Sequence, residues 1–291
     1  MQPIINRGVR AYIVCVDIYQ EIKAFFKRVD AEKQVIGKSV FGREIYAVKM
    51  GEGKPVGIVQ YALHGREYIT AKLAIFHYFY GLEKGTGSIW LVPLANPDGA
   101  LLSQTGLASV EDINARRYLT QINGGEDFSL WKANGRGVDL NVNFDARWGK
   151  GAKNTRTAGG ENYIGARPFS EPETQALKAF TQKIKPAYTV SYHTKGEEIY
   201  WYFYQPISVC ARDKRLALTL SQATGYPLAH AKNSAGGYKD WCIQKLKIPS
   251  FTIETGADEF THPIGNEGLE NIIARNRDGL RALAKEYTRI Q

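Results

Sequence analysis

An apolar run of strand-like composition, residues 56–63, is followed almost at once by an apolar and aromatic segment of helix length, residues 69–82. His64 and Glu67 lie between the two segments. A side chain at the end of a strand and one on the first turn of a helix can converge on one point without straining the backbone. An imidazole and a carboxylate are ligands that Zn²⁺ accepts, and a catalytic zinc normally takes three protein ligands. This junction therefore predicts a strand, a helix and part of a metal site, and it requires a third ligand elsewhere.

Two further apolar strands end in a polar residue of the same kind. Residues 185–192 precede His193, and residues 249–253 precede Glu254. Taken alone, the first is compatible with a structural histidine and the second with a carboxylate that binds local amides. Catalytic residues gather at the carboxyl ends of strands in open α/β sheets. The three strand ends together therefore indicate one site.

Strands and helices alternate along the rest of the chain, which is typical of an α/β domain. The expected helices cover residues 13–29, 170–184, 216–223, 238–246 and 269–289. The other expected elements are a hairpin at 35–49, strands at 87–93 and 198–205, a turn at 96–99 and long loops over 103–170. We predict a single domain over residues 1–291 whose mixed, largely parallel twisted sheet has helices on both faces.

The charge distribution bears on the class of partner. The formal net charge is +9, but the basic residues are spread along the chain with no run longer than two. A nucleic-acid interface would cluster them, so we expect no nucleic-acid partner and favour anions that carry carboxylates. No 18-residue apolar run predicts a membrane span.

Cysteines and the N-terminus bear on location. Three scattered cysteines, Cys15, Cys210 and Cys242, indicate buried reduced thiols rather than a disulfide framework. Residues 1–10 do not have the pattern of a secretory signal. We expect a cytoplasmic protein, with the cell wall or a spore compartment as the alternatives.

Eight blocks, in order, carry a resemblance to a known family. They lie at residues 36–43, 64–67, 96–99, 137–144, 170–173, 191–193, 236–241 and 252–256. With these blocks the chain resembles the zinc carboxypeptidases typified by pancreatic carboxypeptidase A, and more closely their bacterial cell-wall branch, the γ-D-glutamyl-L-diamino acid peptidases.

The resemblance implies a role for each strand-end residue. His64, Glu67 and His193 match the ligands of one Zn²⁺ per chain. Glu254 matches the general base, which takes a proton from the zinc-activated water and passes it to the departing amine. The chain is thus expected to be a zinc-dependent hydrolase.

The family also places cations around the reacting carbonyl. An arginine stabilises the oxyanion, and here Lys132 matches by position whereas Arg136 is the better bidentate donor, so both remain candidates. Arg66 matches an arginine that grips substrate, and its alternative is a solvated surface charge.

Two departures from the digestive enzymes affect specificity. Those enzymes hold the C-terminal carboxylate with an Asn-Arg pair, but this chain has Asn141-Val142, and valine cannot bind a carboxylate. Their mobile tyrosine would fall near Lys232, and Tyr238 is the candidate substitute.

The cell-wall branch acts on peptidoglycan stem peptides, which carry several carboxylates and an ammonium. Arg66, Lys132, Arg136 and Arg147 are candidates for the carboxylates. Asp240 is a candidate for the ammonium, and its alternative is an acidic residue in the first turn of a helix.

We therefore expect a zinc metallopeptidase that hydrolyses the γ-D-glutamyl-diamino acid bond of peptidoglycan-derived peptides, where the diamino acid is meso-diaminopimelate or lysine. One alternative is a general carboxypeptidase or amide hydrolase on the same fold, which should retain the Asn-Arg pair. The other is a non-catalytic module that binds cell-wall peptides. The oligomeric state and the choice between exo- and endo-cleavage do not follow from the residues.

Overall fold

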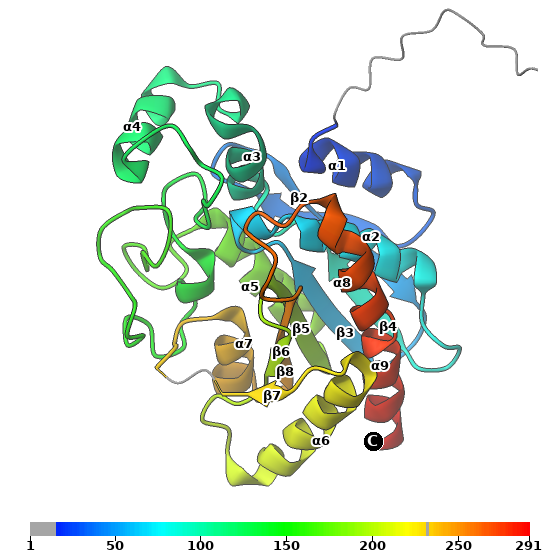
Figure 1. Ribbon diagram of the computed structural model, residues 1–291. Coiled ribbons are helices and arrows are strands. Elements are labelled where there is room, and N and C mark those ends of the chain that lie inside the picture. The colour runs from blue at the N-terminus through cyan, green and yellow to red at the C-terminus, as the bar shows by residue number, and fades with distance from the viewer. Residues whose placement is uncertain (1–15, 231–232) are drawn as a thin grey trace, which may run out of the picture.

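The strands form one mixed sheet whose centre is parallel (Figure 1). The computed structural model describes residues 16–230 and 233–291, and within them the sheet has eight strands in the order β1-β2-β4-β3-β5-β8-β6-β7. The strands are β1 (Lys33–Lys38), β2 (Glu44–Gly51), β3 (Val56–Tyr61), β4 (Ser88–Val92), β5 (Tyr188–Thr194), β6 (Glu198–Tyr200), β7 (Leu228–Ala229) and β8 (Ser250–Thr255). β4, β3, β5 and β8 run parallel, whereas β2 and β6 pair antiparallel to this group.

The central strands are buried on both faces, which explains their nearly continuous apolar sequences. Every residue of β4 and β5 is buried, as are all but the first of β3. Parallel strands covered by helices on both sides show this composition. The predicted α/β sheet is therefore confirmed.

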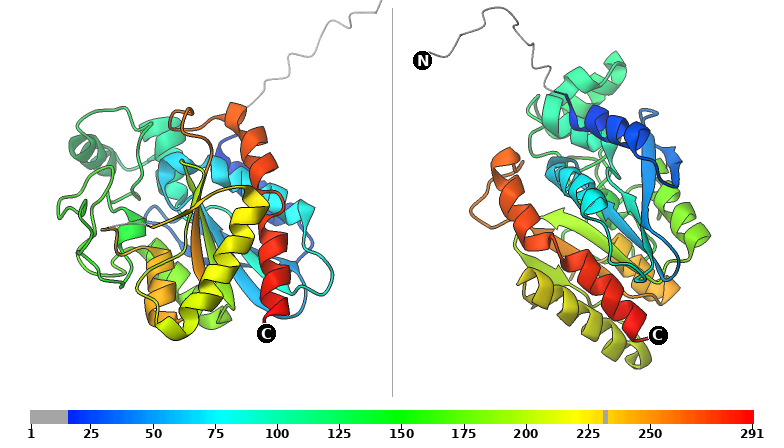
Figure 2. Two further views of the ribbon diagram at one scale, coloured as in Figure 1. Left: turned by 60° about the horizontal axis from the view of Figure 1, so that its bottom comes forward. Right: turned by 90° about the vertical axis from the view of Figure 1, so that its right-hand side faces the viewer.

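Helices cover both faces of the sheet (Figure 2). α2 (Ile69–Tyr80), α6 (Ile207–Thr224), α8 (Leu269–Asn276) and α9 (Gly279–Arg289) contribute to one buried apolar cluster, and α5 (Pro172–Ile184) and α7 (Tyr238–Trp241) to another. In the right-hand view of Figure 2, α8 and α9 lie on one side of the strands and α5 on the other. Among the helices of the described ranges, none is both long enough and apolar enough to cross a membrane.

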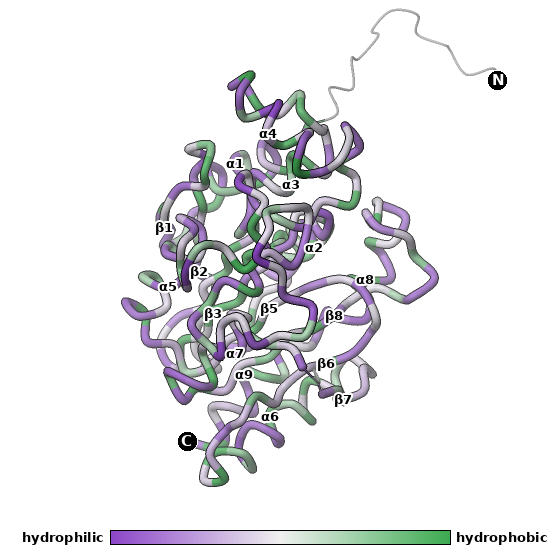
Figure 3. Tube along the Cα trace, turned by 90° about the vertical axis from the view of Figure 1, so that its left-hand side faces the viewer, coloured by the Kyte–Doolittle hydropathy of each residue, from purple (hydrophilic) through white to green (hydrophobic). Residues whose placement is uncertain are grey.

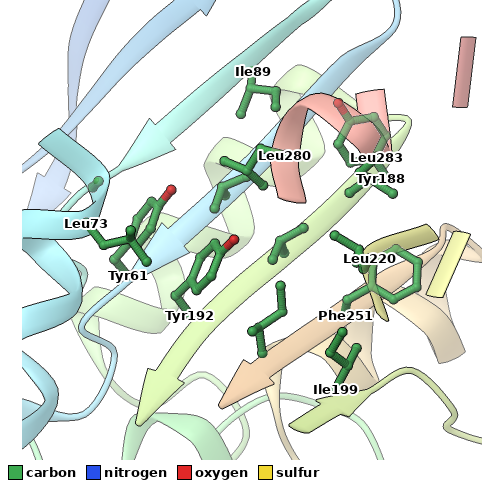
Figure 4. Packing of buried hydrophobic residues seen from close by; sticks show 14 of the residues in the cluster. Tyr61, Leu73, Ile89, Tyr188, Tyr192, Ile199, Leu220, Phe251, Leu280 and Leu283 are labelled. Atoms are coloured by element: carbon green, nitrogen blue, oxygen red, sulfur yellow. The ribbon is translucent and has the colours of Figure 1, made fainter. Parts of the chain in front are cut away.

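The larger core cluster joins the parallel strands to α2, α6 and α9 (Figure 4). Tyr61 of β3 and Tyr192 of β5 stack with their ring centroids 5.1 Å apart and their planes within 3° of parallel. Leu73, Leu220 and Leu280 reach this cluster from the three helices. The neighbouring strands are thereby held by side-chain packing as well as by their hydrogen bonds.

Two predictions about the middle of the chain were wrong. The expected turn at residues 96–99 is the start of α3 (Pro97–Thr105), where the Asn96 side chain accepts a hydrogen bond from the Gly99 amide. The expected loops over 103–170 contain α4 (Ile113–Asn123), on which only Leu119 is fully buried. Hydrophilic and hydrophobic residues are mixed along α4 (Figure 3), and with one fully buried position its apolar signal was weak.

Several predicted boundaries also differ. The helix expected over 13–29 is α1 (Ile18–Arg28), which begins after the capping side chain of Asp17 and ends before Val29. Residues 13–15 of that prediction lie outside the described residues. The C-terminal helix is divided between Asn276 and Gly279, and the strand expected over 198–205 ends at Tyr200.

The two outer strands of the sheet are short or irregular. β1 has a register shift between Val35 and Gly37 and carries Lys33 and Lys38 at its ends. Gly37 approaches α5 so closely that an added Cβ would lie 2.5 Å from the Cβ of Ala176. β7, at the other edge, has two residues.

Packing at α6 gives a stability test with a control on the same helix. Leu220 is fully buried, whereas Leu218 is 44% exposed. We expect Leu220→Ala to lower the free energy of unfolding by about 2–5 kcal/mol, because it removes buried methyl groups and leaves a cavity. Leu218→Ala should change it by about 0.5 kcal/mol or less. Urea unfolding of both variants measures the difference, and equal effects would contradict the packing described for α6.

Candidate active site

The carboxyl ends of three adjacent parallel strands carry the four strand-end residues. His64 follows β3, and Glu67 ends the short helix η1 (Gly65–Glu67) that leads into α2. His193 lies in β5 and Glu254 in β8, and the two are direct partners in the parallel ladder. Sheet pairing alone therefore places Glu254 beside His193.

Close backbone packing fixes the loop that carries His64 and Glu67. The Gly65 amide donates to the Lys132 carbonyl at 2.9 Å, and the Arg66 amide to the Trp131 carbonyl at 2.8 Å. A Cβ on Gly65 would lie 2.4 Å from the Gly99 carbonyl oxygen and 2.7 Å from that of Trp131, so only glycine fits. The loop is thus tied to residues 131–132, which bring Lys132 to the site.

His64, Glu67 and His193 form a buried cluster whose ligand atoms lie within 4.8 Å of one another. The Nδ1 atoms of the two histidines are 3.1 Å apart. Glu67 contacts both, with Oε1 2.8 Å from Nδ1 of His64 and Oε2 2.9 Å from Nδ1 of His193. Two imidazole nitrogens and a carboxylate that point at one place are a donor set that fits Zn²⁺.

Asp139 is a residue beside the cluster that the sequence reasoning missed. Its Oδ1 atom lies 3.3 Å from Nε2 of His64, on the far side of the ring from the cluster, and both residues are buried. The Asn141 and Asn162 amides also donate to the Asp139 carboxylate. A carboxylate in this position fixes the tautomer and the ring orientation of a ligating histidine. The signal was present, since Asp139 lies in one of the eight matching blocks.

Burial and charge act in opposite directions on the ligand pKa values. Burial would lower the pKa of His64, but the Glu67 and Asp139 carboxylates raise it to about 9. Burial lowers the pKa of His193 despite the nearby Glu67. For Glu67 burial would raise the pKa, yet the two imidazoles hold it well below its usual value. The cluster therefore retains a carboxylate.

Glu254 lies between this cluster and a cavity of about 560 Å³ whose wall it helps to form. Burial and the neighbouring Glu67 charge raise the pKa of Glu254 to about 8, whereas the charges of His64 and Lys132 lower it. A carboxyl group whose pKa lies near neutrality can both accept and return a proton. Glu254 is therefore suited to acid and base chemistry in the wall of the cavity.

The cavity has a zwitterionic wall. Lys239 and Asp240 both line it and are buried, with Nζ of the lysine 2.6 Å from Oδ1 of the aspartate. The other carboxylate oxygen of Asp240 accepts a hydrogen bond from the Gly237 amide at the start of α7. The predicted ammonium site is thus already paired with a cation, and Lys239 is a second residue that the sequence reasoning missed. Val142 also lines the cavity.

The structure separates the two candidates for the oxyanion. Lys132 lies near the cluster. Burial and other charges have the larger effects on the pKa values of His64, His193 and Glu254, and the charge of Lys132 lowers all three. Its Nζ is 3.9 Å from Glu161. The side chain of Arg136 is 56% exposed and faces Glu171, at 3.7 Å. Of the two, only Lys132 is placed at the site.

Of the remaining candidates for substrate binding, two lie at the site and two do not. Arg66 and Asn141 lie at the site, the first next to Glu67 and the second in the cavity wall. Arg147 is exposed and stacks on Tyr204, with its guanidinium 4.4 Å from the ring centroid. Tyr238 is fully buried in the core and its hydroxyl is 2.8 Å from that of Thr181, so it does not face the cavity. Lys232, near which the tyrosine of the digestive enzymes was expected, lies outside the described residues.

Comparison with known proteins agrees with this geometry. The zinc carboxypeptidase family profile matches residues 19–278. The chain is 32% identical over 248 residues to γ-D-glutamyl-L-diamino acid endopeptidase 1 of Lysinibacillus sphaericus, which covers 79% of this chain and 61% of that relative. It is 36% identical over 135 residues to murein peptide amidase A of Escherichia coli strain K12, covering 42% of this chain and 50% of the relative. The chain thus spans less than two thirds of the length of either relative.

Among solved structures, bovine thrombin-activatable fibrinolysis inhibitor in complex with tick carboxypeptidase inhibitor matches with a TM-score of 0.74. The match covers 94% of this chain and 96% of that one at 20% identity. At that identity the likeness establishes the fold.

The contact between Asp139 and His64 predicts how metal binding depends on the outer residues. We expect wild-type protein to hold one zinc per chain, and Asp139→Asn to bind it about 10–100-fold more weakly, because the amide no longer fixes the imidazole. Competition with a chromophoric chelator measures both affinities.

Asp145→Asn is the matched control, since Asp145 is half exposed and pairs with Lys245 at 3.1 Å, away from the cluster. It should bind zinc as the wild type does. Equal affinities for Asp139→Asn and Asp145→Asn would refute the role given to Asp139.

Proposed function

Because this chain belongs to the zinc carboxypeptidase family, we propose that it is a zinc-dependent peptidase that cleaves γ-D-glutamyl-diamino acid bonds in peptidoglycan-derived peptides. His64, Glu67 and His193 would hold the metal, one ion per chain. A bound zinc supplies a Lewis acid that lowers the pKa of water and polarises a carbonyl.

The protein side chains then perform the proton transfers and stabilise charge. Glu254 takes a proton from the attacking water and delivers it to the departing amine, a cycle that suits its raised pKa. Lys132, on the segment that is hydrogen-bonded to Gly65 and Arg66, supplies a positive charge for the developing oxyanion. Asp139 keeps the His64 imidazole in one orientation.

The zwitterionic wall of the cavity is the observation that carries the choice of substrate. The far end of meso-diaminopimelate has both an ammonium and a carboxylate, so it can pair with Asp240 and Lys239 respectively. Lysine offers only the ammonium and would leave the buried Lys239 without a new partner. We therefore propose that the diamino acid is meso-diaminopimelate and that it occupies this cavity as the leaving group.

Val142 stands where the digestive enzymes have the arginine of the Asn-Arg pair, and this argues against the alternative of a general carboxypeptidase. This apolar side chain lines the cavity, and Gly236 approaches its backbone so closely that an added Cβ would lie 2.8 Å from the Val142 carbonyl oxygen. Because residue 142 is valine, this chain has no bidentate arginine at the position where the digestive enzymes hold a C-terminal carboxylate. Murein peptide amidase A, a relative by sequence, is named for a cell-wall peptide, which supports the same choice.

The direct test uses defined peptides. The zinc-loaded protein should convert L-Ala-γ-D-Glu-meso-diaminopimelate into L-Ala-D-Glu and free meso-diaminopimelate, detected by mass spectrometry. The peptide with L-lysine in the last position should be cleaved at about one tenth of that rate or below, because it lacks the carboxylate that pairs with Lys239. Cleavage of a C-terminal aromatic dipeptide with no cleavage of either γ-D-glutamyl peptide would overturn the proposal.

Glu254→Gln separates catalysis from binding. We expect kcat to fall by about 10²–10⁴-fold, because the amide cannot accept the proton, while zinc content stays at the wild-type level. Glu259→Gln, an exposed position in the segment after β8, is the control and should retain activity. If the wild type binds the peptide without turning it over, the chain is a binding module; if Glu254→Gln has full turnover, another residue is the base.

A further inference from the structure

A short loop, residues 151–154, forms part of the wall of the cavity. The Ala152 amide donates to the Asn233 carbonyl at 2.8 Å, and the Asn154 amide donates to the Gly151 carbonyl at 3.2 Å. In Figure 1 the loop belongs to the green segment before α5, beside the segment that leads into α7. Backbone hydrogen bonds therefore fix the loop as one side of the cavity.

The side chain of Asn154 lies over Gly151 and carries an unused donor. A Cβ on Gly151 would lie 2.6 Å from Oδ1 of Asn154, so only glycine leaves room for this amide group. The Nδ2 atom of Asn154 is buried and has no hydrogen-bond partner within the described ranges. A buried donor costs free energy unless an acceptor reaches it. Because Asn154 lines the cavity, a ligand in the cavity can supply that acceptor.

Lys153 and Asn141 add two further donors to the same cavity. Other lysines of the described ranges, such as Lys132 and Lys239, form ion pairs, but no described carboxylate pairs with Lys153. Oδ1 of Asn141 accepts a hydrogen bond from the Tyr238 amide at 3.3 Å, so the NH₂ group of Asn141 is the part that donates. One ammonium and two amide NH₂ groups are donors to which a carboxylate binds.

The charges of the cavity match those of the proposed leaving group. Apart from Glu254, the charged side chains that line it within the described part of the chain are Lys153, Lys239 and Asp240. A meso-diaminopimelate bound through one amine carries two carboxylates and one ammonium. The proposed pairing of its far end uses Lys239 and Asp240. One carboxylate, the one next to the scissile bond, and one cation, Lys153, then remain.

Asn141 connects this wall to the metal cluster. Its backbone amide donates at 3.0 Å to Oδ1 of Asp139, and the same oxygen lies 3.3 Å from Nε2 of His64. Glu254 lines the same cavity. The α-carboxylate of a leaving residue is two bonds from the scissile nitrogen, so it enters the cavity at the end nearest to the cluster. Asn141 is therefore placed to contact it.

Building on the proposed function, we propose that Lys153 and Asn154, together with Asn141, bind the free α-carboxylate of a C-terminal diamino acid. The positive charge then comes from a loop outside the Asn141-Val142 pair, and it acts as a single ammonium rather than as a bidentate fork. A longer stem peptide has a neutral amide in place of this carboxylate and leaves Lys153 without a partner. The chain is accordingly an exopeptidase for peptides that end in the diamino acid.

The test changes the group at the C-terminus of the substrate. We compare kcat/KM for L-Ala-γ-D-Glu-meso-diaminopimelate with that for the same peptide whose carboxylate next to the scissile bond is a primary amide, and with that for the peptide extended by D-Ala. The wild type should prefer the free carboxylate by about tenfold or more over both, as expected for charge-assisted hydrogen bonds. In Lys153→Met and in Asn154→Ala these ratios should fall toward one, with zinc content retained.

A variant of a neighbouring lysine excludes a general effect of charge. Lys150 is exposed, lies three residues before Lys153 and does not line the cavity. Lys150→Met removes the same charge from the same segment of the chain. It should keep both wild-type ratios.

The outcomes separate the two proposals. If the wild type cleaves none of the three peptides, the proposed function is wrong. If it cleaves the amide or the extended peptide as fast as the free acid, or if Lys153→Met keeps the wild-type ratios, the function stands and the role of the loop is wrong. An equal fall of the ratios in Lys150→Met and Lys153→Met would also overturn that role.

Discussion

The parallel pairing of β3, β5 and β8 is the constraint on which the site depends. It sets Tyr61 beside Tyr192 and His193 beside Glu254 without any contact between the functional side chains themselves. Since side chains alternate between the faces of a strand, a slip of one residue in either pair would turn His193 or Glu254 to the opposite face. The stacked tyrosines and the leucines behind them hold the register. The core is therefore what positions the chemistry.

The sequence predicted the parts of the site that lie on strands and failed where loops meet. His64, His193 and Glu254 each follow or end an apolar run, and the order of strands in an α/β sheet brings such ends together. Asp139 follows no apolar strand, and His64 becomes its neighbour only when distant loops pack. Lys239 pairs with the adjacent Asp240 in α7, and the sequence does not show that both residues line the cavity. The choice between Lys132 and Arg136 depended likewise on the backbone pairing of Gly65 with Lys132.

The same physical reason explains the error at residues 96–99. Asn-Pro-Asp-Gly satisfies the local rules both for a turn and for the first turn of a helix. The Asn96 amide group decides the outcome, since it donates to the Lys132 and Ala133 carbonyls while its oxygen caps α3. These carbonyls are more than thirty residues away along the chain. Local preference alone could not distinguish the two structures.

The shape of the outer strands has a consequence for association. A sheet edge exposes unpaired amides and carbonyls on which another chain can add a strand. At one edge the irregular register of β1, its terminal lysines and the contact of Gly37 with α5 interrupt that row; at the other, β7 offers two residues. Within the described ranges, neither border presents a long flat template, so the sheet is protected against edge-to-edge aggregation.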